Sequence, residues 1–168
     1  MNMKTFKGKP ITLLGETKKV GDIAPDFKAL NTKNELKHLS DYKSRYIILN
    51  VVPSLDTTVC DMQARTVNNE LAEREDVLVI TISNDLPSAQ GRWCGNSGLP
   101  NVITLSDHVE LDFANKYGTN IKEVRLQARS VFVLDESKKI IYIEYVDEMS
   151  SHLNFDELIT FVKKLPKE

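Results

Sequence analysis

The chain has 168 residues, of which 41% are hydrophobic and 27% charged, and its formal net charge is -2. These values fit one compact domain, residues 1–168, with a sizeable core. The absence of a basic excess makes nucleic acid and anionic membrane poor candidates for partners. The longest apolar runs are too short to cross a bilayer, which needs about 20 consecutive apolar residues.

The N-terminal residues 1–14 contain lysines but no apolar core followed by a cleavage site, so we do not read them as a secretory signal and expect a cytoplasmic protein. Cys60 and Cys94 are the only two cysteines. In a cytosolic chain of this length they are either inert thiols or a redox pair rather than a disulfide scaffold. The three histidines are too scattered for a zinc site, and we expect no metal.

The first half of the chain predicts a hairpin, a buried strand and a helix. Residues 4–15 indicate two short strands around Gly8 to Pro10, and residues 21–31 indicate an irregular segment. Residues 45–52 are apolar at both odd and even positions, which is typical of a central strand covered on both faces. This strand is expected to end at Pro53.

Apolar residues then recur at helical spacing, which predicts a helix from about Thr58 to Arg74, with Asp56 or Thr57 as its cap. The remaining elements are expected as strands at 77–83 and 101–107, a short helix within 108–117 that stops at Gly118, a strand hairpin over 128–146 and a final helix over 155–165. This order predicts an α/β fold with a mixed central β-sheet flanked by helices on both faces.

Cys60 falls in the first turn of the helix predicted to begin near Thr58. Free backbone N–H groups and the positive end of the helix dipole favour a thiolate at that position. The alternative is strong, because free cysteines are among the most buried residues and usually only pack. Polar residues on both sides of Cys60 favour a reactive thiol, since a cysteine that only packs rarely needs them: Thr57, Thr58 and Asp61.

Cys94 follows a predicted strand and lies in a segment rich in glycine and proline, which predicts an exposed, mobile stretch. These residues are Gly91, Gly95, Gly98 and Pro100. A C-x-x-C motif is absent, so an internal disulfide would require this segment to approach the first helix. A thiol packed behind Trp93 remains the alternative.

Four stretches in order give the chain a specific resemblance: "PSLDTTVC", "SNDLPSAQGRWCG", "LPNVITLSD" and "ARSVFVLDE". The first is similar to the P-x-x-x-T-x-x-C signature of peroxiredoxins. Together the four resemble the thiol peroxidase branch, the atypical two-cysteine peroxiredoxins of bacteria. The resemblance implies a thioredoxin-like fold with an N-terminal β-hairpin, and a homodimer.

The resemblance also implies a role for each site residue. Cys60 would be the peroxidatic cysteine and Cys94 the resolving one, joined in an intramolecular disulfide during the cycle. Thr57 would bind the thiolate and the peroxide, Pro53 would shield the sulfur from water, and Arg129 would complete the active site. The simpler alternatives are a helix cap for Thr57, a strand terminator for Pro53 and a surface charge for Arg129.

The implied activity is reduction of hydrogen peroxide and small organic hydroperoxides, with thioredoxin as the reductant and no metal, haem or flavin. A redox sensor that uses the same cysteines as a switch, and a thioredoxin-fold module with structural thiols, are the competing interpretations. Three positions depart from the family pattern: Thr58 replaces a usual glycine, Ser88 a phenylalanine, and Gln127 an apolar residue.

Overall fold

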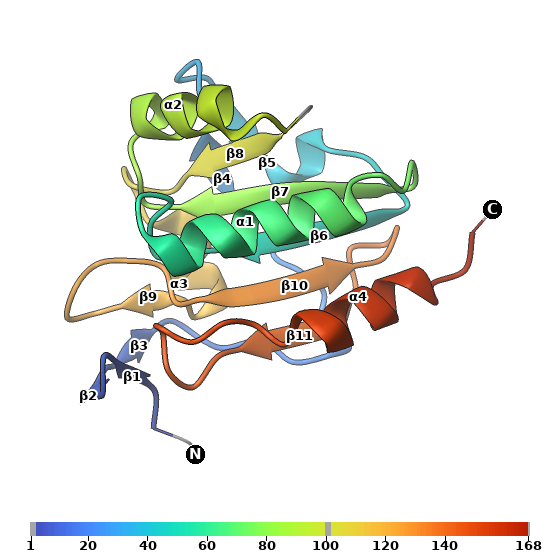
Figure 1. Ribbon diagram of the computed structural model, residues 1–168. Coiled ribbons are helices and arrows are strands. Elements are labelled where there is room, and N and C mark those ends of the chain that lie inside the picture. The colour runs from blue at the N-terminus through green and yellow to red at the C-terminus, as the bar shows by residue number, and fades with distance from the viewer. Residues whose placement is uncertain (1–2, 100–101, 168) are drawn as a thin grey trace.

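The computed structural model describes residues 3–99 and 102–167. A seven-stranded mixed sheet runs through its centre in the order β11-β10-β6-β7-β8-β4-β5 (Figure 1). Its strands are β4 (Lys28–Leu30), β5 (Leu36–His38), β6 (Tyr46–Val51), β7 (Val77–Ser83), β8 (Ile103–Ser106), β10 (Ser130–Leu134) and β11 (Ile140–Tyr145). The pairs β6-β7 and β7-β8 are parallel and the other pairs are antiparallel, so the predicted mixed sheet is confirmed.

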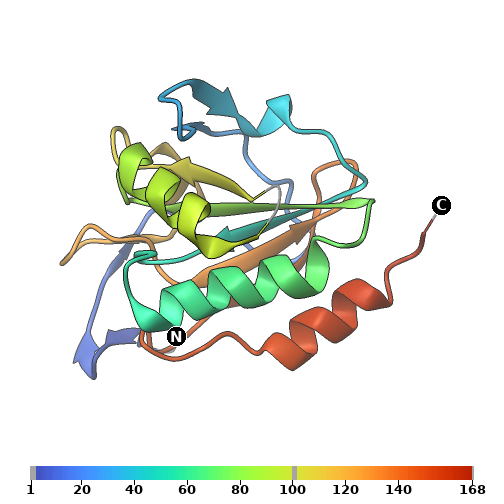
Figure 2. The ribbon, with the colours of Figure 1, turned by 45° about the horizontal axis from the view of Figure 1, so that its top comes forward.

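Helices cover both faces of the sheet, as expected, and Figure 2 shows the two that share one face side by side, in green and red. The helices are α1 (Thr58–Leu71), α2 (Pro87–Ser97), α3 (Asp112–Tyr117) and α4 (Phe155–Lys163), with a short 3₁₀ helix at Leu39–Asp41. Helices α1 and α4 share one apolar cluster, whereas α3 belongs to a cluster on the opposite face. Helix α2 packs against β8 and contacts α1 through Trp93. Among residues 3–99 and 102–167, no helix is both long and apolar enough to span a membrane.

Strand β6 divides the core into these two clusters. Tyr46 and Ile48 point to the α1 and α4 side, and Ile47 and Leu49 point to the α3 side. All six residues of the strand are buried. A strand covered on both faces therefore explains why the residues at both odd and even positions are apolar.

The predicted N-terminal hairpin is present as β1 (Thr5–Phe6) and β2 (Lys9–Pro10). Its turn residues Lys7 and Gly8 have φ angles of 51° and 79°. Positive φ at both central residues is the pattern of a type I′ turn, whose twist matches that of the flanking strands. After the hairpin, β3 (Leu13–Leu14) pairs with β9 (Asn120–Ile121) in a separate two-stranded sheet.

Several expectations need correction. Helix α1 ends at Leu71, three residues before Arg74. The segment around Cys94, expected to be exposed and mobile, is helix α2, in which Cys94 is half-buried. The hairpin turn lies at Lys7 and Gly8 rather than at Gly8 to Pro10, since Lys9–Pro10 forms β2, and Leu13–Leu14 pairs with β9 instead of with β1. Strands β4, β5 and β9 were not expected, and β4 lies within residues 21–31, which were expected to be irregular. Asn101, where the third strand was expected to begin, and Pro100, expected in the mobile segment, lie outside the described residues.

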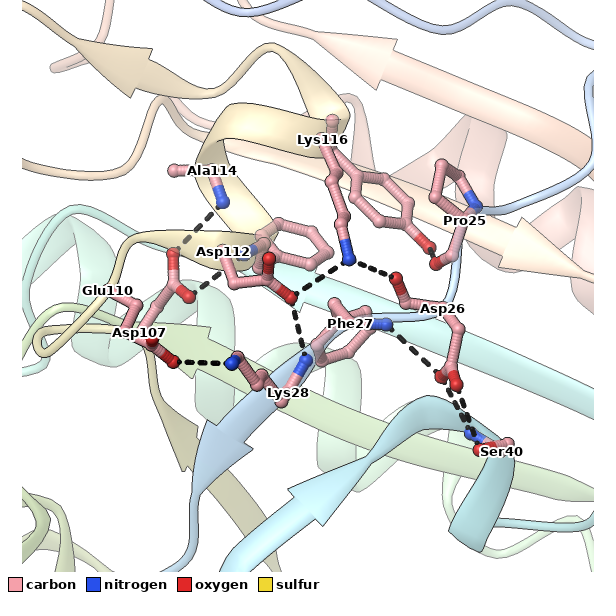
Figure 3. Close-up of polar contacts among 12 residues, drawn as sticks. Pro25, Asp26, Phe27, Lys28, Ser40, Asp107, Glu110, Asp112, Ala114 and Lys116 are labelled. Carbon is pink, nitrogen blue, oxygen red and sulfur yellow. Dashed lines mark hydrogen bonds and ion pairs between the residues drawn. The ribbon is translucent and has the colours of Figure 1, made fainter.

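Polar contacts fix α3 against one face of the sheet (Figure 3). The Asp107 carboxylate accepts the N–H groups of Phe113 and Ala114 at 3.0 and 2.9 Å, so it satisfies the free donors of the first turn. Asp112 in turn accepts the backbone N–H of Lys28 at 2.9 Å, which joins α3 to β4. The helix stops at Gly118 as predicted, with a φ of 71°.

Candidate active site

Cys60 lies in the first turn of α1, where the chain leaves the parallel strand β6. Its side chain is 1% exposed and packs in a small cluster with Val52, Leu55 and Ala64. The helix start is at the carboxyl end of a central strand, where α/β folds commonly place reactive groups. Burial excludes water from the sulfur, so the groups that contact it decide its chemistry.

Two donors point at the sulfur. The backbone N–H of Ser54 lies 3.5 Å from Cys60 Sγ, and Arg129 Nη2 lies 3.2 Å from it. A guanidinium at this distance in a buried site stabilises negative charge on sulfur far more than it would in water. The predicted association of Cys60 with Arg129, 69 residues apart in sequence, is present in the fold.

Arg129 precedes β10 and is 2% exposed, so the surface-charge interpretation is wrong. Its Nε donates to the Met149 backbone oxygen at 2.9 Å, and its Nη1 donates to Gln63 Oε1 at 2.9 Å. Its backbone N–H also points at the Met149 thioether sulfur, 3.2 Å away. These partners leave the guanidinium one orientation, with Nη2 directed at Cys60.

Gln63 extends this support into the sheet. Its amide nitrogen donates to Asn50 Oδ1 at 2.7 Å and to the backbone oxygen of Val51 at 3.1 Å. Asn50 then donates to Thr81 Oγ1 on β7 at 3.2 Å. The chain of bonds fixes the amide oxygen of Gln63 as the acceptor that faces Arg129.

Thr57 and Pro53 lie on the turn between β6 and α1. Thr57 has the backbone conformation of an N-cap residue, but its side chain makes no capping bond. Its hydroxyl instead donates to the Ser54 backbone oxygen at 2.9 Å, which leaves its lone pairs free to accept a hydrogen bond. Pro53 is buried, two residues after the end of β6.

Asp85 holds this turn in place from the end of β7. Its carboxylate accepts the Ser54 hydroxyl at 2.7 Å and the Leu55 backbone N–H at 2.8 Å. Because Ser54 also directs its own N–H at the sulfur, Asp85 fixes one of the two donors around Cys60.

A pocket of about 230 Å³ opens over these residues. Pro53, Thr57, Cys60 and Arg129, four of the five predicted site residues, line it together. The rest of the lining is Phe6, Lys7, Ser54, Thr58, Val59, Leu126, Met149 and Ser150. The pocket therefore combines a sulfur and a guanidinium with mostly apolar walls.

Cys94, the fifth predicted residue, lies on α2 and does not line the pocket. Its sulfur is 3.6 Å from Thr104 Oγ1 on β8, and both cysteines are free thiols. Its neighbour Trp93 packs against the Cys60 cluster and donates its indole N–H to Asp61 at 2.6 Å. Trp93 and Asp61 are the sequence neighbours of Cys94 and Cys60, so this hydrogen bond joins α2 to α1 beside both cysteines.

Comparison with known proteins places this geometry in a family. The Redoxin family model matches residues 19–159. The thiol peroxidase of Bacillus subtilis is 53% identical over 163 residues, which are 97% of this chain and 98% of that protein. The thiol peroxidase of Oceanobacillus iheyensis is 51% identical over 164 residues, covering 98% of this chain and 100% of that protein.

The chain belongs to the thiol peroxidase family. Among solved structures, a peroxiredoxin-like protein from Aquifex aeolicus superposes with a TM-score of 0.89 at 35% identity, covering 98% of this chain and 97% of that one. The thioredoxin-like fold that the four stretches of sequence implied is thereby confirmed. As a member of the thiol peroxidases, the protein is a peroxiredoxin-type oxidoreductase.

For a thiol peroxidase the arrangement has a clear chemical use. A cysteine thiolate is a nucleophile, and the pocket opens over the sulfur of Cys60. Donors at Arg129 and Ser54 face the same sulfur, where they can stabilise negative charge. Within residues 3–99 and 102–167, no three His, Cys, Asp or Glu side chains are grouped so as to hold a metal ion.

Sequence reasoning missed four residues that support this candidate site: Ser54, Gln63, Asp85 and Met149. Gln63 had a local signal, since it follows Cys60 by one helical turn and Asn50 interrupts an otherwise apolar strand. Met149 had none, because a methionine in a loop carries no sign that its backbone oxygen and sulfur hold an arginine. Of the departures, Gln127 is buried and donates to Asn84 and Asp107 at 2.9 and 2.7 Å, so its polarity is fully used.

Proposed function

We propose that the protein reduces hydrogen peroxide and organic hydroperoxides at Cys60. The thiolate attacks the terminal oxygen of the hydroperoxide, the O–O bond breaks, and Cys60 becomes a sulfenic acid. The leaving oxygen takes up a proton and departs as water or an alcohol. The observation that carries this proposal is the contact between Arg129 Nη2 and Cys60 Sγ inside an apolar pocket.

The role of Arg129 in this proposal goes beyond ionising the thiol. An ordinary cysteine, with a pKa of about 8.5, is roughly 3% thiolate at neutral pH, so full ionisation raises the reactive fraction at most about thirtyfold. Part of that gain is lost because a more acidic thiol is a weaker nucleophile. Efficient reduction therefore requires donors that stabilise the transition state as charge moves onto the leaving oxygen. Arg129 and the Ser54 N–H are the available donors at the sulfur.

Thr57 and Pro53 complete the proposed peroxide site. The Thr57 hydroxyl already donates to Ser54, so it is oriented to accept the O–H of a hydroperoxide. Pro53 offers no N–H and lines the pocket beside the sulfur, where it keeps water away. Both roles follow from the pocket lining and need no movement of the chain.

Cys94 is proposed to resolve the sulfenic acid. Its thiol attacks the Cys60 sulfur, a disulfide forms and water leaves; a dithiol of thioredoxin then reduces the bridge through a mixed disulfide. In the structure Cys94 contacts Thr104, so α2 must release from β8 and α1 before the two sulfurs can bond. Both cysteines are free thiols, as in the reduced state with which the proposed cycle begins.

The experiment that tests this function is a turnover assay with hydrogen peroxide, thioredoxin, thioredoxin reductase and NADPH. We expect continuous NADPH oxidation by the unchanged protein and none by Cys60→Ser. Activity that survives in Cys60→Ser would refute the assignment of the nucleophile. Oxidation that stops after one equivalent of peroxide, despite thioredoxin, would instead indicate a redox sensor.

The remaining proposals concern context. We propose that residues 1–168 act as one domain, because the N-terminal hairpin lines the same pocket as Arg129. We propose a homodimer: Met62, Leu86 and Val124 are exposed apolar residues on segments next to the site, and sedimentation velocity would test it. A cytoplasmic location suits the cycle, because that compartment keeps thiols reduced.

A further inference from the structure

Glu148 gathers hydrogen bonds from two segments that are far apart in sequence. Its carboxylate accepts the backbone N–H of Gly8 at 2.7 Å, the backbone N–H of Lys7 at 3.2 Å and the Thr5 hydroxyl at 3.0 Å. It also accepts the backbone N–H of Ser150 at 2.6 Å and the Ser150 hydroxyl. The N-terminal hairpin and the loop after β11 are thus joined at one side chain.

The hairpin depends on this attachment. Each of its strands has two residues, and an isolated hairpin of that size is not stable in water. The positive φ angles of Lys7 and Gly8 turn two successive N–H groups toward the same side, which makes a concave anion site that Glu148 occupies. Thr5 adds two backbone bonds, from its N–H to Asp147 and from the Met149 N–H to its oxygen, both of 2.8 Å.

The two segments joined by Glu148 form walls of the pocket over Cys60. Phe6 and Lys7 come from the hairpin, and Met149 and Ser150 come from the loop. The pocket of about 230 Å³ has room for far more than one molecule of the size of water, so hydrogen peroxide does not fill it. A hydroperoxide with an apolar group can contact the hairpin wall, whereas hydrogen peroxide reaches only the polar groups at the sulfur.

We propose that Glu148 is a positioning residue that holds Phe6 and the hairpin wall over Cys60, and so determines a preference for hydroperoxides with a bulky apolar group. This inference rests on the proposed peroxidase function of Cys60. Glu148 does not touch the reacting atoms; it acts through the wall that the apolar part of the substrate contacts. Its effect is therefore on the relative rates of two substrates rather than on the chemistry common to both.

The test compares the rate constants for Cys60 oxidation by cumene hydroperoxide and by hydrogen peroxide, measured by rapid quench and mass spectrometry. In Glu148→Gln we expect the rate constant for cumene hydroperoxide, divided by that for hydrogen peroxide, to fall about fivefold, because part of the apolar contact is lost. Glu123→Gln is the matched control: Glu123 also accepts a backbone N–H of the N-terminal segment, from Thr12 at 2.8 Å, but does not line the pocket. Its ratio should not change.

Phe6→Ala removes the wall directly and supplies a second variant. We expect the ratio to fall at least as far, and we expect the double variant Glu148→Gln with Phe6→Ala to fall no further than Phe6→Ala alone, because Glu148 acts only through that contact. An unchanged ratio in Phe6→Ala, or equal losses with both peroxides in Glu148→Gln, would overturn the inference. Failure of the unchanged protein to oxidise at Cys60 with either peroxide would be distinct, since it would refute the proposed function itself.

Discussion

At the scale of single residues, Arg129 and Glu148 act by different physical means. Arg129 is buried, and three of its nitrogen atoms have partners at Met149, Gln63 and Cys60. In the proposed reaction its contribution comes from a fixed charge in a buried position. Glu148 lies closer to solvent, and its contribution comes from the number of donors that its carboxylate accepts.

Replacing Arg129 with a neutral side chain of similar length tests the contribution of its charge. For Arg129→Met we expect the rate constant of Cys60 oxidation by hydrogen peroxide to fall about a hundredfold, the typical effect of removing one oxyanion donor. The loss should persist on the high-pH plateau of the rate, where ionisation of the thiol no longer limits it. Rapid kinetics across pH would show this, with Arg92→Met, an exposed position on α2, as the control. Full recovery at high pH would mean that Arg129 only ionises the thiol.

The pKa of Glu148 gives a prediction for stability. Hydrogen bonds from Ser150, and then from Gly8 and Thr5, lower this pKa from its usual 4.5 to about 2 despite some desolvation. A lowered acid pKa stabilises the fold above the unfolded value and loses that contribution as pH falls. The unchanged protein should therefore exceed Glu148→Gln in unfolding free energy by about 1 kcal/mol at neutral pH, and this difference should shrink between pH 4.5 and about 2. Urea titrations at several pH values measure it; a difference that stays constant in that range would contradict the assignment.

At the scale of elements, the junction of α1 and α2 controls the distance between the two cysteines. Trp93 donates to Asp61, and Arg65 Nη1 donates to the Ser97 backbone oxygen at 2.8 Å. The Arg65 guanidinium also lies 5.7 Å from the centre of the Trp93 ring, so one arginine contacts α2 twice. Under the proposed mechanism, these bonds break before Cys94 bonds to Cys60.

Weakening this junction should speed disulfide formation. Trp93→Phe keeps an aromatic ring but removes the N–H that Asp61 accepts, which we expect to raise the rate of bridge formation after one equivalent of peroxide about tenfold. Quenched samples analysed by mass spectrometry give this rate. If the bridge forms at the same rate or more slowly, release of α2 is not what limits the step.

The elements also show where sequence reasoning succeeds. Strand β6 and helix α1 have strong local patterns, and their positions were predicted to within three residues. Helix α2 was missed because Gly91 and Gly95 disfavour a helix, and tertiary contacts compensate. Gln90, for example, is buried and donates to Ser83 on β7 and to the Leu105 backbone oxygen on β8.

The site was predictable only in part for a related reason. The position of Cys60 at a helix start was read from local sequence, but the contact with Arg129 spans 69 residues and was expected only from the family resemblance. Met149 and Glu148 were not expected at all. Their role arises from the loop that returns to the hairpin, and no local pattern encodes that arrangement.

At the scale of the whole molecule, an aromatic cluster ties the sheet to α3. The ring of Phe132 on β10 contacts Phe113 and Tyr117 of α3, with centroids 6.2 and 5.3 Å away, and also Tyr145 of β11 at 5.4 Å. Since β10 follows Arg129 directly, the packing of this strand also sets the position of the guanidinium.

Truncating Phe132 tests whether the aromatic cluster holds β10 in place. Phe132 is fully buried, and Phe132→Ala should cost about 3–5 kcal/mol in unfolding free energy, or about 10 °C in melting temperature for a chain of this size. Thermal unfolding followed by circular dichroism measures the shift. A change below about 2 °C would show that the cluster relaxes around the cavity and does not hold β10 in place.

The most direct test of the central claim, that Cys60 reduces the peroxide and Cys94 resolves it, is mass spectrometry of the intact and digested protein after one equivalent of hydrogen peroxide. The unchanged protein should become lighter by two hydrogens and yield a peptide pair joined through Cys60 and Cys94. Cys94→Ser should instead gain one oxygen at Cys60, and Cys60→Ser should remain unmodified. Oxidation of Cys94 in Cys60→Ser at the rate of the unchanged protein, or an unmodified Cys60 in the unchanged protein, would contradict the claim.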